Sequence, residues 1–393
     1  MKTCIVLISH SFRINSRIFK KAMTDYSNFI VVYSSPWYWS KSEKNVLSKG
    51  DSSFHFLTIN HFSYELKDRY SSELYIIKEE NPIPKIKQLF LETKADKILY
   101  DMPLFGKSSW LDLSDLPHEV IDSDTHDPQC EKMTAKSRWA YWSKNRIGCS
   151  TLPDFNDELL KISLNNHKPN KEKYLELNLE IKKDLSRFSS LILDYGKQRN
   201  SRQGSSRLSK YLHHGLIDAN ELTSKILSLV PGFIEKTNPL VPFLRQLAFR
   251  EICIRKARVR DLSMNNTVEV WIEKSIDKKS VDNLKKEFDQ KYTIKQMMTG
   301  TTGDEMLDFE IKLAIKERWM ANRARMWLSG EFYYCLGGGL KSVEALIDFF
   351  NSFIEDGQSP NNYICCAEAM RLQYGKVMRY NRERTNKLLN EVF

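Results

Sequence analysis

Hydrophobic and polar positions follow two different patterns along the chain. In the first 125 residues, short β-branched runs alternate with helical stretches such as 16–23 and 85–92. The runs cover residues 4–8, 29–34, 54–59, 97–100 and 119–122. Such alternation is typical of a parallel sheet flanked by helices. We therefore predict an α/β domain over residues 1–125.

A polar connector over residues 126–170 leads into a second region, in which the apolar period is helical. Helices are expected over residues 174–187, 206–214, 220–230, 241–258, 281–291, 303–332 and 340–353. The glycine triplet 337–339 should end one helix before the next begins. The predicted fold class is therefore α/β, with an N-terminal parallel-sheet domain followed by an all-helical domain over residues 171–393.

One helical stretch, residues 319–326, contains polar groups among apolar neighbours that predict burial. Arg325 and Met326 lie three and four positions after Asn322, on much the same side of a helix. Burying an amide and a guanidinium is costly unless they have partners, so we expect something polar against this face. The alternative is a helix whose arginines reach solvent.

Two further segments have the same character. Phe243, Gln246 and Arg250 place an aromatic ring, an amide and a cation on one helix face. Ser205 and Ser206 stand just before a helical run, where serine caps the helix and its free N–H groups attract anions. Taken alone, each segment is equally compatible with a capped helix or an amphipathic core helix. Together they favour one helical cavity for a phosphate-bearing aromatic ligand.

These segments resemble motifs of the photolyase/cryptochrome flavoproteins. The run at 205–212 is similar to the family's phosphate-binding serine motif, and 319–326 is similar to its Trp-Met-His-Asn-Arg-x-Arg-Met. The C-terminal motifs are closest to class II cyclobutane pyrimidine dimer photolyases. The matching segments, in collinear order, are 195–200, 205–212, 243–251, 302–308, 319–326, 356–363 and 374–381.

The resemblance implies that the helical domain binds FAD. It places Phe243 where the family has a tryptophan, pairs Arg325 with Asp356 in a buried salt bridge, and turns Asn361 or Asn362 toward the flavin ring. The implied cofactor-binding residues are Tyr195, Ser205, Ser206, Leu208, Ser209, Phe243, Arg250, Arg325, Asp356, Gln358, Asn361 and Asn362. A second, antenna chromophore in the first domain is compatible with this pattern, but its identity is not given by the sequence.

The implied activity is light-dependent repair of cyclobutane pyrimidine dimers by electron transfer from excited reduced FAD. The enzyme would be a carbon–carbon lyase, a deoxyribodipyrimidine photo-lyase. Gln246, Asn322 and Met326 are expected at the lesion. Residues expected to contact UV-damaged DNA are Arg245, Phe249, Arg323, Lys376, Arg379 and Arg382.

Three departures from the family pattern, at Gln246, at Gln358 with Ser359 and at the relay tryptophans, leave alternatives open. Gln246 replaces a glutamate, which keeps a cryptochrome-like photoreceptor without repair as an alternative. Repair of (6-4) photoproducts is less favoured, because that branch carries histidines where this chain has Asn322 and Met326. The usual relay tryptophans are missing. Trp327 is the candidate substitute, with packing between helices as its alternative role.

Composition agrees with this interpretation. The net charge of +10 suits a polyanionic partner, and the hydrophobic content of 41% fits a folded soluble protein. Seven cysteines without a CxxC pair indicate reduced thiols and no metal site. No apolar stretch approaches the length of a membrane span. We expect a cytoplasmic monomer. A flavin-free helical nucleic-acid binder, colourless on purification, is a third alternative.

Overall fold

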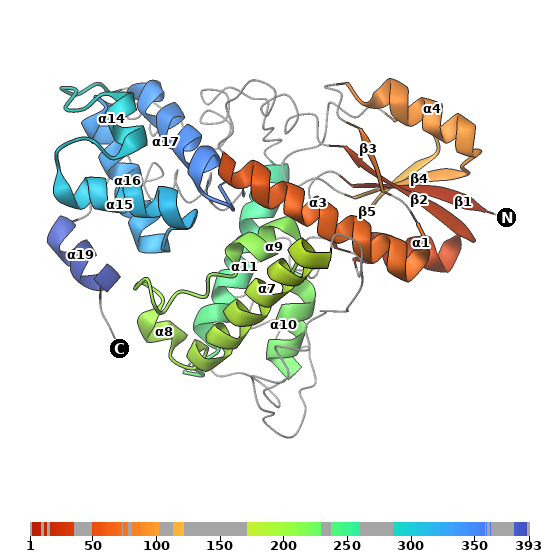
Figure 1. The fold of residues 1–393 in the computed structure, drawn as a ribbon, viewed down its shortest axis with the longest axis horizontal. Coiled ribbons are helices and arrows are strands. Elements are labelled where there is room, and N and C mark those ends of the chain that lie inside the picture. The colour runs from red at the N-terminus through yellow and green to blue at the C-terminus, as the bar shows by residue number, and fades with distance from the viewer. Residues whose placement is uncertain are drawn as a thin grey trace.

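The fold combines a small sheet at the N-terminal end with a larger helical region (Figure 1). The computed structural model describes residues 2–8, 12–13, 16–34, 49–72, 74–77, 81–101, 113–121, 171–228, 237–259, 286–357, 359, 362 and 381–390. All structural statements below concern this described part of the chain.

The described strands form one parallel sheet in the order β3-β2-β1-β4-β5. Their bounds are β1 (Thr3–Ile8), β2 (Asn28–Ser34), β3 (Leu74–Ile77), β4 (Lys97–Asp101) and β5 (His118–Ile121). Side chains of β1 alternate between the two faces, because successive residues of a strand point to opposite sides. Val6 and Ile8 pack with α1 (Arg17–Asp25) and α3 (Lys49–Tyr70), whereas Ile5 and Leu7 pack with α4 (Ile83–Thr93).

The predicted strand over residues 54–59 is wrong, because this segment is part of the long helix α3. Its buried residues Phe54, Thr58, Phe62 and Leu66 are spaced four apart, which is the spacing of one helix face. A short run of apolar residues is compatible with a strand as well as with a helix. The helical spacing becomes visible only over the longer segment that forms α3. The short strand β3 was not predicted.

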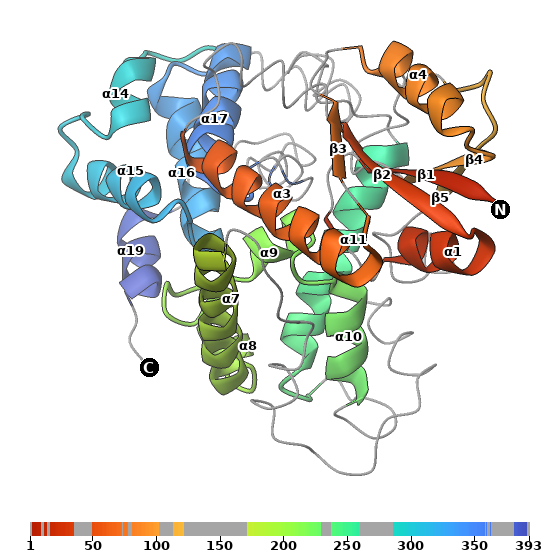
Figure 2. The ribbon, with the colours of Figure 1, turned by 45° about the vertical axis from the view of Figure 1, so that its right-hand side comes forward.

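The helical region contains two packed groups (Figure 2). The first comprises α7 (Lys171–Leu191), α8 (Tyr195–Gln198), α9 (Ser209–His214), α10 (Ala219–Ser228) and α11 (Val241–Val259). The second comprises α14 (Ile294–Thr299), α15 (Glu305–Glu317), α16 (Asn322–Cys335), α17 (Gly339–Phe353) and α19 (Arg382–Asn390). Each group has its own apolar core.

The single helix predicted over residues 303–332 is in fact two helices, α15 and α16. Arg318 adopts a left-handed conformation with φ of 51° and ends α15, and the extended Ala321 precedes α16. Trp319 and Met320 therefore lie in the connection and not in a helix. No glycine or proline marks this break, so the sequence gives no local signal for it.

Two other helix predictions have different outcomes. The glycine triplet separates α16 from α17 as expected, with positive φ at Gly337, Gly338 and Gly339. The helix expected over residues 281–291 is wrong in its described part, where Glu287 forms an antiparallel bridge with Gly338. This bridge gives the glycine triplet a backbone partner.

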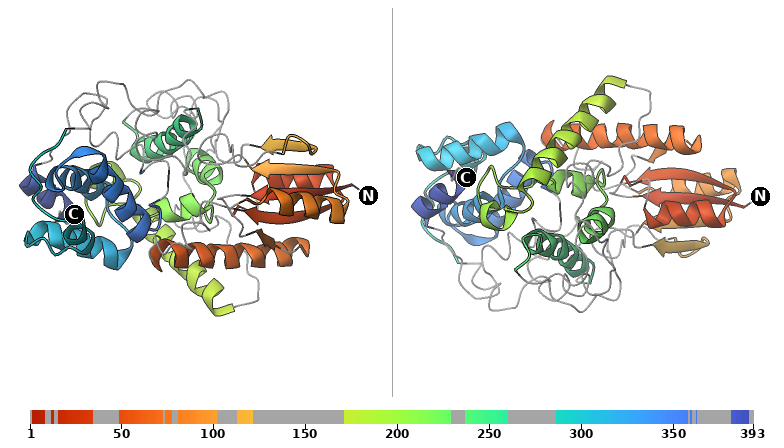
Figure 3. Two further views of the ribbon diagram at one scale, coloured as in Figure 1. Left: turned by 90° about the horizontal axis from the view of Figure 1, so that it is seen from above. Right: turned by 90° about the horizontal axis from the view of Figure 1, so that it is seen from below.

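Helix α3 runs alongside both the sheet and the helical region (Figure 3). It contacts α7 and α17, and its Phe54 belongs to the core of the first helical group. None of the helices in the described ranges is long and apolar enough to cross a membrane.

Candidate functional site

A cavity of about 190 Å³ lies between the two helical groups and is lined by residues of both. Most residues predicted for the site come together here although they are far apart in the sequence. The predicted residues in its lining are Tyr195, Ser205, Ser206, Ser209, Phe243, Gln246, Phe249, Arg250, Asn322, Arg325, Asp356 and Asn362.

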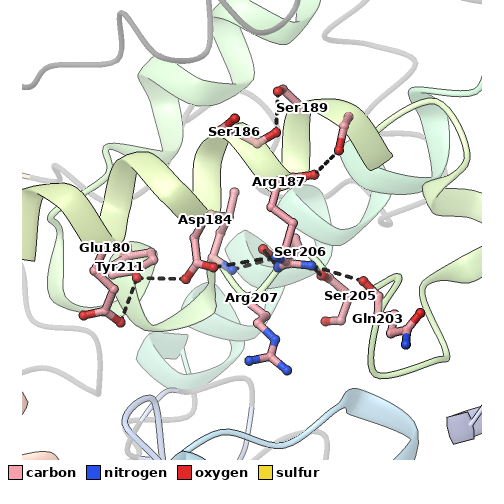
Figure 4. Close-up of polar contacts among 12 residues, drawn as sticks. Glu180, Asp184, Ser186, Arg187, Ser189, Gln203, Ser205, Ser206, Arg207 and Tyr211 are labelled. Carbon is pink, nitrogen blue, oxygen red and sulfur yellow. Dashed lines mark hydrogen bonds and ion pairs between the residues drawn. The ribbon is translucent and has the colours of Figure 1, made fainter.

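Arg187 on α7 fixes the segment that carries the lining serines, residues 203–206, here called the serine loop (Figure 4). Its Nη1 donates to the carbonyl oxygens of Gln203 at 3.1 Å and Ser205 at 2.9 Å, and its Nη2 donates to that of Ser206 at 2.9 Å. Three charge-assisted bonds therefore hold this loop from the side of α7. Sequence reasoning missed Arg187, because its partners are backbone carbonyls that no side-chain pattern reveals.

The serines do not cap α9 as predicted. The helix begins at Ser209, its N-cap is Leu208, and no side chain accepts there. Arg207, with φ of 57°, turns the chain between the serines and the helix. Ser206 Oγ accepts a bond of 3.4 Å from the amide of Leu208, which is itself buried in the core and absent from the cavity lining.

An aromatic wall closes one side of the cavity. The ring of Tyr195 meets that of Phe243 edge-on, at 5.3 Å between centroids, and Phe188 packs 4.4 Å from Phe243. Burial raises the pKa of Tyr195 to about 12, so its hydroxyl stays protonated at neutral pH. Such a wall offers rigid apolar surface with one polar group.

The lining also contains the predicted ion pair between Arg325 and Asp356, which the geometry confirms. Arg325 Nη2 lies 2.9 Å from Asp356 Oδ1, and Nη1 lies 3.1 Å from Oδ2, with side chains only 12% and 6% exposed. Arg325 also donates from Nε to the carbonyl of Met320 at 2.9 Å and from Nη1 to Asn362 Oδ1 at 2.6 Å. This bidentate arrangement fixes the guanidinium in place.

The amide of Asn362 is fully used within this network. Its Nδ2 donates to the carbonyl oxygens of Asp356 at 2.5 Å and Gly357 at 3.2 Å, while its Oδ1 accepts from Arg325. Asn362 therefore braces the turn of residues 354–357, here called the Asp356 turn. The other predicted candidates of this segment, Gln358 and Asn361, lie outside the described residues.

The predicted face of α11 lines the cavity. Gln246 and Phe249 are partly exposed to it, and Arg250 donates from Nη2 to the carbonyl of Leu212 at 3.1 Å. Asn322, the first residue of α16, is exposed and directs Nδ2 toward Met326 Sδ at 3.7 Å. The shared face of these two residues is as predicted, although only Asn322 lines the cavity.

Several lining residues were not predicted as site residues. Arg207 lies 4.4 Å above the ring of Trp319 and pairs with Glu317 at 3.2 Å, which joins the serine loop to the connection between α15 and α16. A cation over an indole face is a stabilising contact. The remaining additions to the lining are Leu212, His213, Leu247, Ile254, Met320 and Ser359.

Other predicted residues lie away from the cavity lining. Trp327 is fully buried and donates from Nε1 to Glu331 at 3.2 Å. Arg382, expected at DNA, pairs with Glu331 at 2.7 Å and with Asp304, and so binds α19 to α15 and α16. Arg245 and Arg323 are partly buried on α11 and α16 outside the lining. Lys376 and Arg379 lie outside the described residues.

The fold is that of the photolyases: an N-terminal α/β domain with a five-stranded parallel sheet, followed by a helical region. A similar solved structure is that of a bacterial class III photolyase from Agrobacterium tumefaciens, with a TM-score of 0.67. Sequence identity is 16%, over 99% of this chain and 85% of that one. No family model and no curated protein matches the chain. The predicted resemblance to class II therefore stays a prediction.

Proposed function

We propose that this chain is a FAD-dependent photolyase that uses light to repair cyclobutane pyrimidine dimers in DNA. The observation that carries the proposal is the meeting of the serine loop, the aromatic wall and the Arg325–Asp356 pair in one cavity, in a chain with the photolyase fold. The collinear sequence motifs between residues 195 and 381 support the same assignment.

The residues around the cavity fit FAD by their chemistry. The hydroxyls of Ser205, Ser206 and Ser209 offer donors for phosphate oxygens, and Arg250 adds a positive charge. Tyr195 and Phe243 provide a wall for a planar ring system. When bound, FAD supplies light absorption and the one-electron chemistry that opens the cyclobutane ring.

The Arg325–Asp356 pair fixes the distribution of charge in its part of the cavity lining. Asp356 is the one carboxylate in the described lining, and Arg325 neutralises it through two bonds. An anionic ligand therefore meets no uncompensated negative charge there. Four bonds to protein groups fix the orientation of the Arg325 guanidinium.

The polar residues of the lining also suit the base edges of a pyrimidine dimer. Gln246 and Asn322 carry amides that both donate and accept hydrogen bonds, as base edges require. Phe249 offers a ring for stacking. A dimer is already poorly stacked in the duplex, so turning it out into the cavity costs little. The net charge of +10 favours approach to the phosphate backbone.

The direct test is light-dependent loss of cyclobutane dimers from irradiated DNA, compared with a dark sample of the same purified protein. We expect loss only in the light. A protein that binds FAD but leaves the dimers unchanged would support the alternative, a cryptochrome-like photoreceptor. The observation that favours this alternative is Gln246, an amide in the lining where the family carries an acid. A colourless protein would contradict both.

The Asp356→Ala variant tests the cofactor assignment. It leaves the guanidinium of Arg325 buried without its carboxylate, a change that costs about 3–5 kcal/mol when one partner of a buried pair is removed. We expect the variant to purify with little FAD, as measured by absorbance against protein concentration. Full FAD occupancy would show that the pair does not support the cofactor.

A further inference from the structure

Lys210 lies behind the cavity wall at the meeting point of several elements. Its Nζ is 2.6 Å from Glu180 Oε1 on α7 and 2.8 Å from Glu355 Oε2, and its side chain is 12% exposed. The rings of Phe54 on α3 and Tyr211 each lie 5.1 Å from the same ammonium group. Burial disfavours the charged form of Lys210, but the two carboxylates outweigh it and raise its pKa. The ammonium group of Lys210 therefore stays charged.

Glu355 belongs to the Asp356 turn and immediately precedes Asp356. Its amide donates to the carbonyl of Arg318 at 3.0 Å, and its carbonyl bonds His214 Nε2 at 3.0 Å. The turn is thus held between the end of α15 and α9 by its backbone, and Lys210 adds a contact to its side chain. Any movement of Glu355 moves the carboxylate that binds Arg325.

Glu180 leads from Lys210 to the serine loop. The hydroxyl oxygen of Tyr211 lies 3.2 Å from Glu180 Oε1 and 2.9 Å from Asp184 Oδ2, so its one proton is shared between the two carboxylates. Asp184 pairs with Arg187 at 3.6 Å (Figure 4). Arg187 then holds the carbonyls of the serine loop. A continuous set of polar contacts therefore joins the Asp356 turn to the serine loop, and neither Lys210, Glu180, Asp184, Arg187 nor Glu355 is among the described lining residues.

We propose that Lys210 is a positioning residue of the cavity, which sets the Asp356 turn and the serine loop at the separation that the ligand requires. Lys210 touches no ligand itself. It acts through Glu355 on the Arg325–Asp356 pair and through Glu180 on the loop. The identity of the ligand, FAD, rests on the proposed function, whereas the bridge rests on the contacts of Lys210 alone.

A pair of variants separates this role from simple stabilisation. Lys210→Met leaves Glu355 buried without its cation and should lower both stability and FAD binding. The double variant Lys210→Met, Glu355→Gln also removes the buried charge, so thermal stability should return close to that of the parent. FAD binding should not return, because the bridge is still missing. We expect its dissociation constant to be about tenfold higher than the parent's, equivalent to one charge-assisted hydrogen bond.

The measurements are FAD titration by fluorescence quenching and amide hydrogen exchange of the serine loop and the Asp356 turn. Exchange in both segments should be faster in the double variant. Lys197→Met is the matched control, since this lysine is 82% exposed on α8 and should change neither measurement. A stable double variant with the parent's FAD affinity and exchange rates overturns the proposal. If the parent itself binds no FAD, the proposed function fails, and the exchange rates alone decide on the bridge.

Discussion

Gln246 lies on the cavity face of α11, one turn from Phe243 and one turn from Arg250. Its neutral amide can donate as well as accept, whereas a carboxylate only accepts. Under the proposed function, this difference makes Gln246 the residue of the described lining that most directly distinguishes repair from photoreception.

We predict that Gln246→Ala lowers the yield of dimer repair about fivefold, as the loss of a hydrogen bond of ~1 kcal/mol implies. FAD content should stay normal, because the amide is expected at the substrate. Gln246→Glu should keep or raise the yield. The measurement is dimers repaired per photon absorbed, with Gln88→Ala on the exposed face of α4 as the control. An unchanged yield in Gln246→Ala would remove this residue from the substrate site.

Trp327 has a defined hydrogen bond as well as a core position. Its indole donates to Glu331, which also binds Arg382 and receives a weak bond of 3.5 Å from Cys335 Sγ. Trp327→Phe should cost about 1–2 kcal/mol of unfolding free energy, because a buried acceptor loses one of its donors. The expectation that an electron relay begins at or near this tryptophan remains a prediction, which the same variant tests.

We expect Trp327→Phe to slow photoreduction of oxidised flavin by an external donor, measured by absorbance under blue light. Repair by chemically pre-reduced protein should persist, because that cycle requires no relay. Photoreduction at the parent's rate would mean that Trp327 only packs and donates to Glu331.

At the scale of elements, the contact between α3 and α7 carries its own pH dependence. His61 stacks on Tyr174 at 4.6 Å and bonds Asn178 at 3.2 Å. Burial lowers the pKa of His61 from 6.5 to about 4, so the folded protein favours the neutral ring. The stability contributed by the buried, neutral ring of His61 is fully present above pH 6.5. It is lost as pH falls toward 4.

We predict that the difference in unfolding free energy between the parent and His61→Phe shrinks by about 2 kcal/mol from pH 7.5 to pH 5. Glu65, one turn along α3, works in the opposite sense, because burial raises its pKa to about 7. Comparing parent and variant at each pH by urea unfolding cancels this contribution. A difference that stays constant with pH would contradict a buried neutral histidine.

The start of α17 depends on close backbone approach. A Cβ at Gly338 would lie 2.3 Å from the carbonyl oxygen of Lys286, and the residue has φ of 77°. Gly338→Ala should therefore lower unfolding free energy by more than the roughly 1–3 kcal/mol of the backbone conformation alone, because φ of 77° with ψ of −162° suits essentially only glycine. Gly339→Ala is the matched control, with φ of 70° and no atom within 4 Å of its Cβ. Equal losses in thermal unfolding would show that the contact with Lys286 yields easily.

At the scale of the whole molecule, the features that could be predicted from the sequence are those marked by the spacing of apolar residues or by glycine. The parallel sheet, the helical region and the break at residues 337–339 follow from such signals. The length of α3 could not be read from a short apolar run, and the break at Arg318 has no local marker. The cavity's supports were also hidden, because Arg187 binds carbonyls and Lys210 binds carboxylates about 30 and 145 positions away.

The candidate residues could be named from their motifs. Which of them face the cavity, and which support the surrounding backbone, could not be predicted. Asn322 reaches the cavity while Met326 does not, since the break before α16 places Asn322 at the helix start. Asn362 is committed to the Asp356 turn, which only its bonding partners reveal. Motifs report residue types, and the surrounding backbone decides which side chain meets a ligand.

Helix α3 has a consequence for how such chains can be recombined. It follows β2 in the sequence, yet Phe54 and Leu57 pack in the first helical core, and His61 and Tyr64 contact Tyr174 on α7. A chimera joined at residue 125 would bring a foreign α3 against this chain's α7 and leave those contacts mismatched. A chimera that keeps these contacts must therefore take α3 and its α7 partners from the same parent protein.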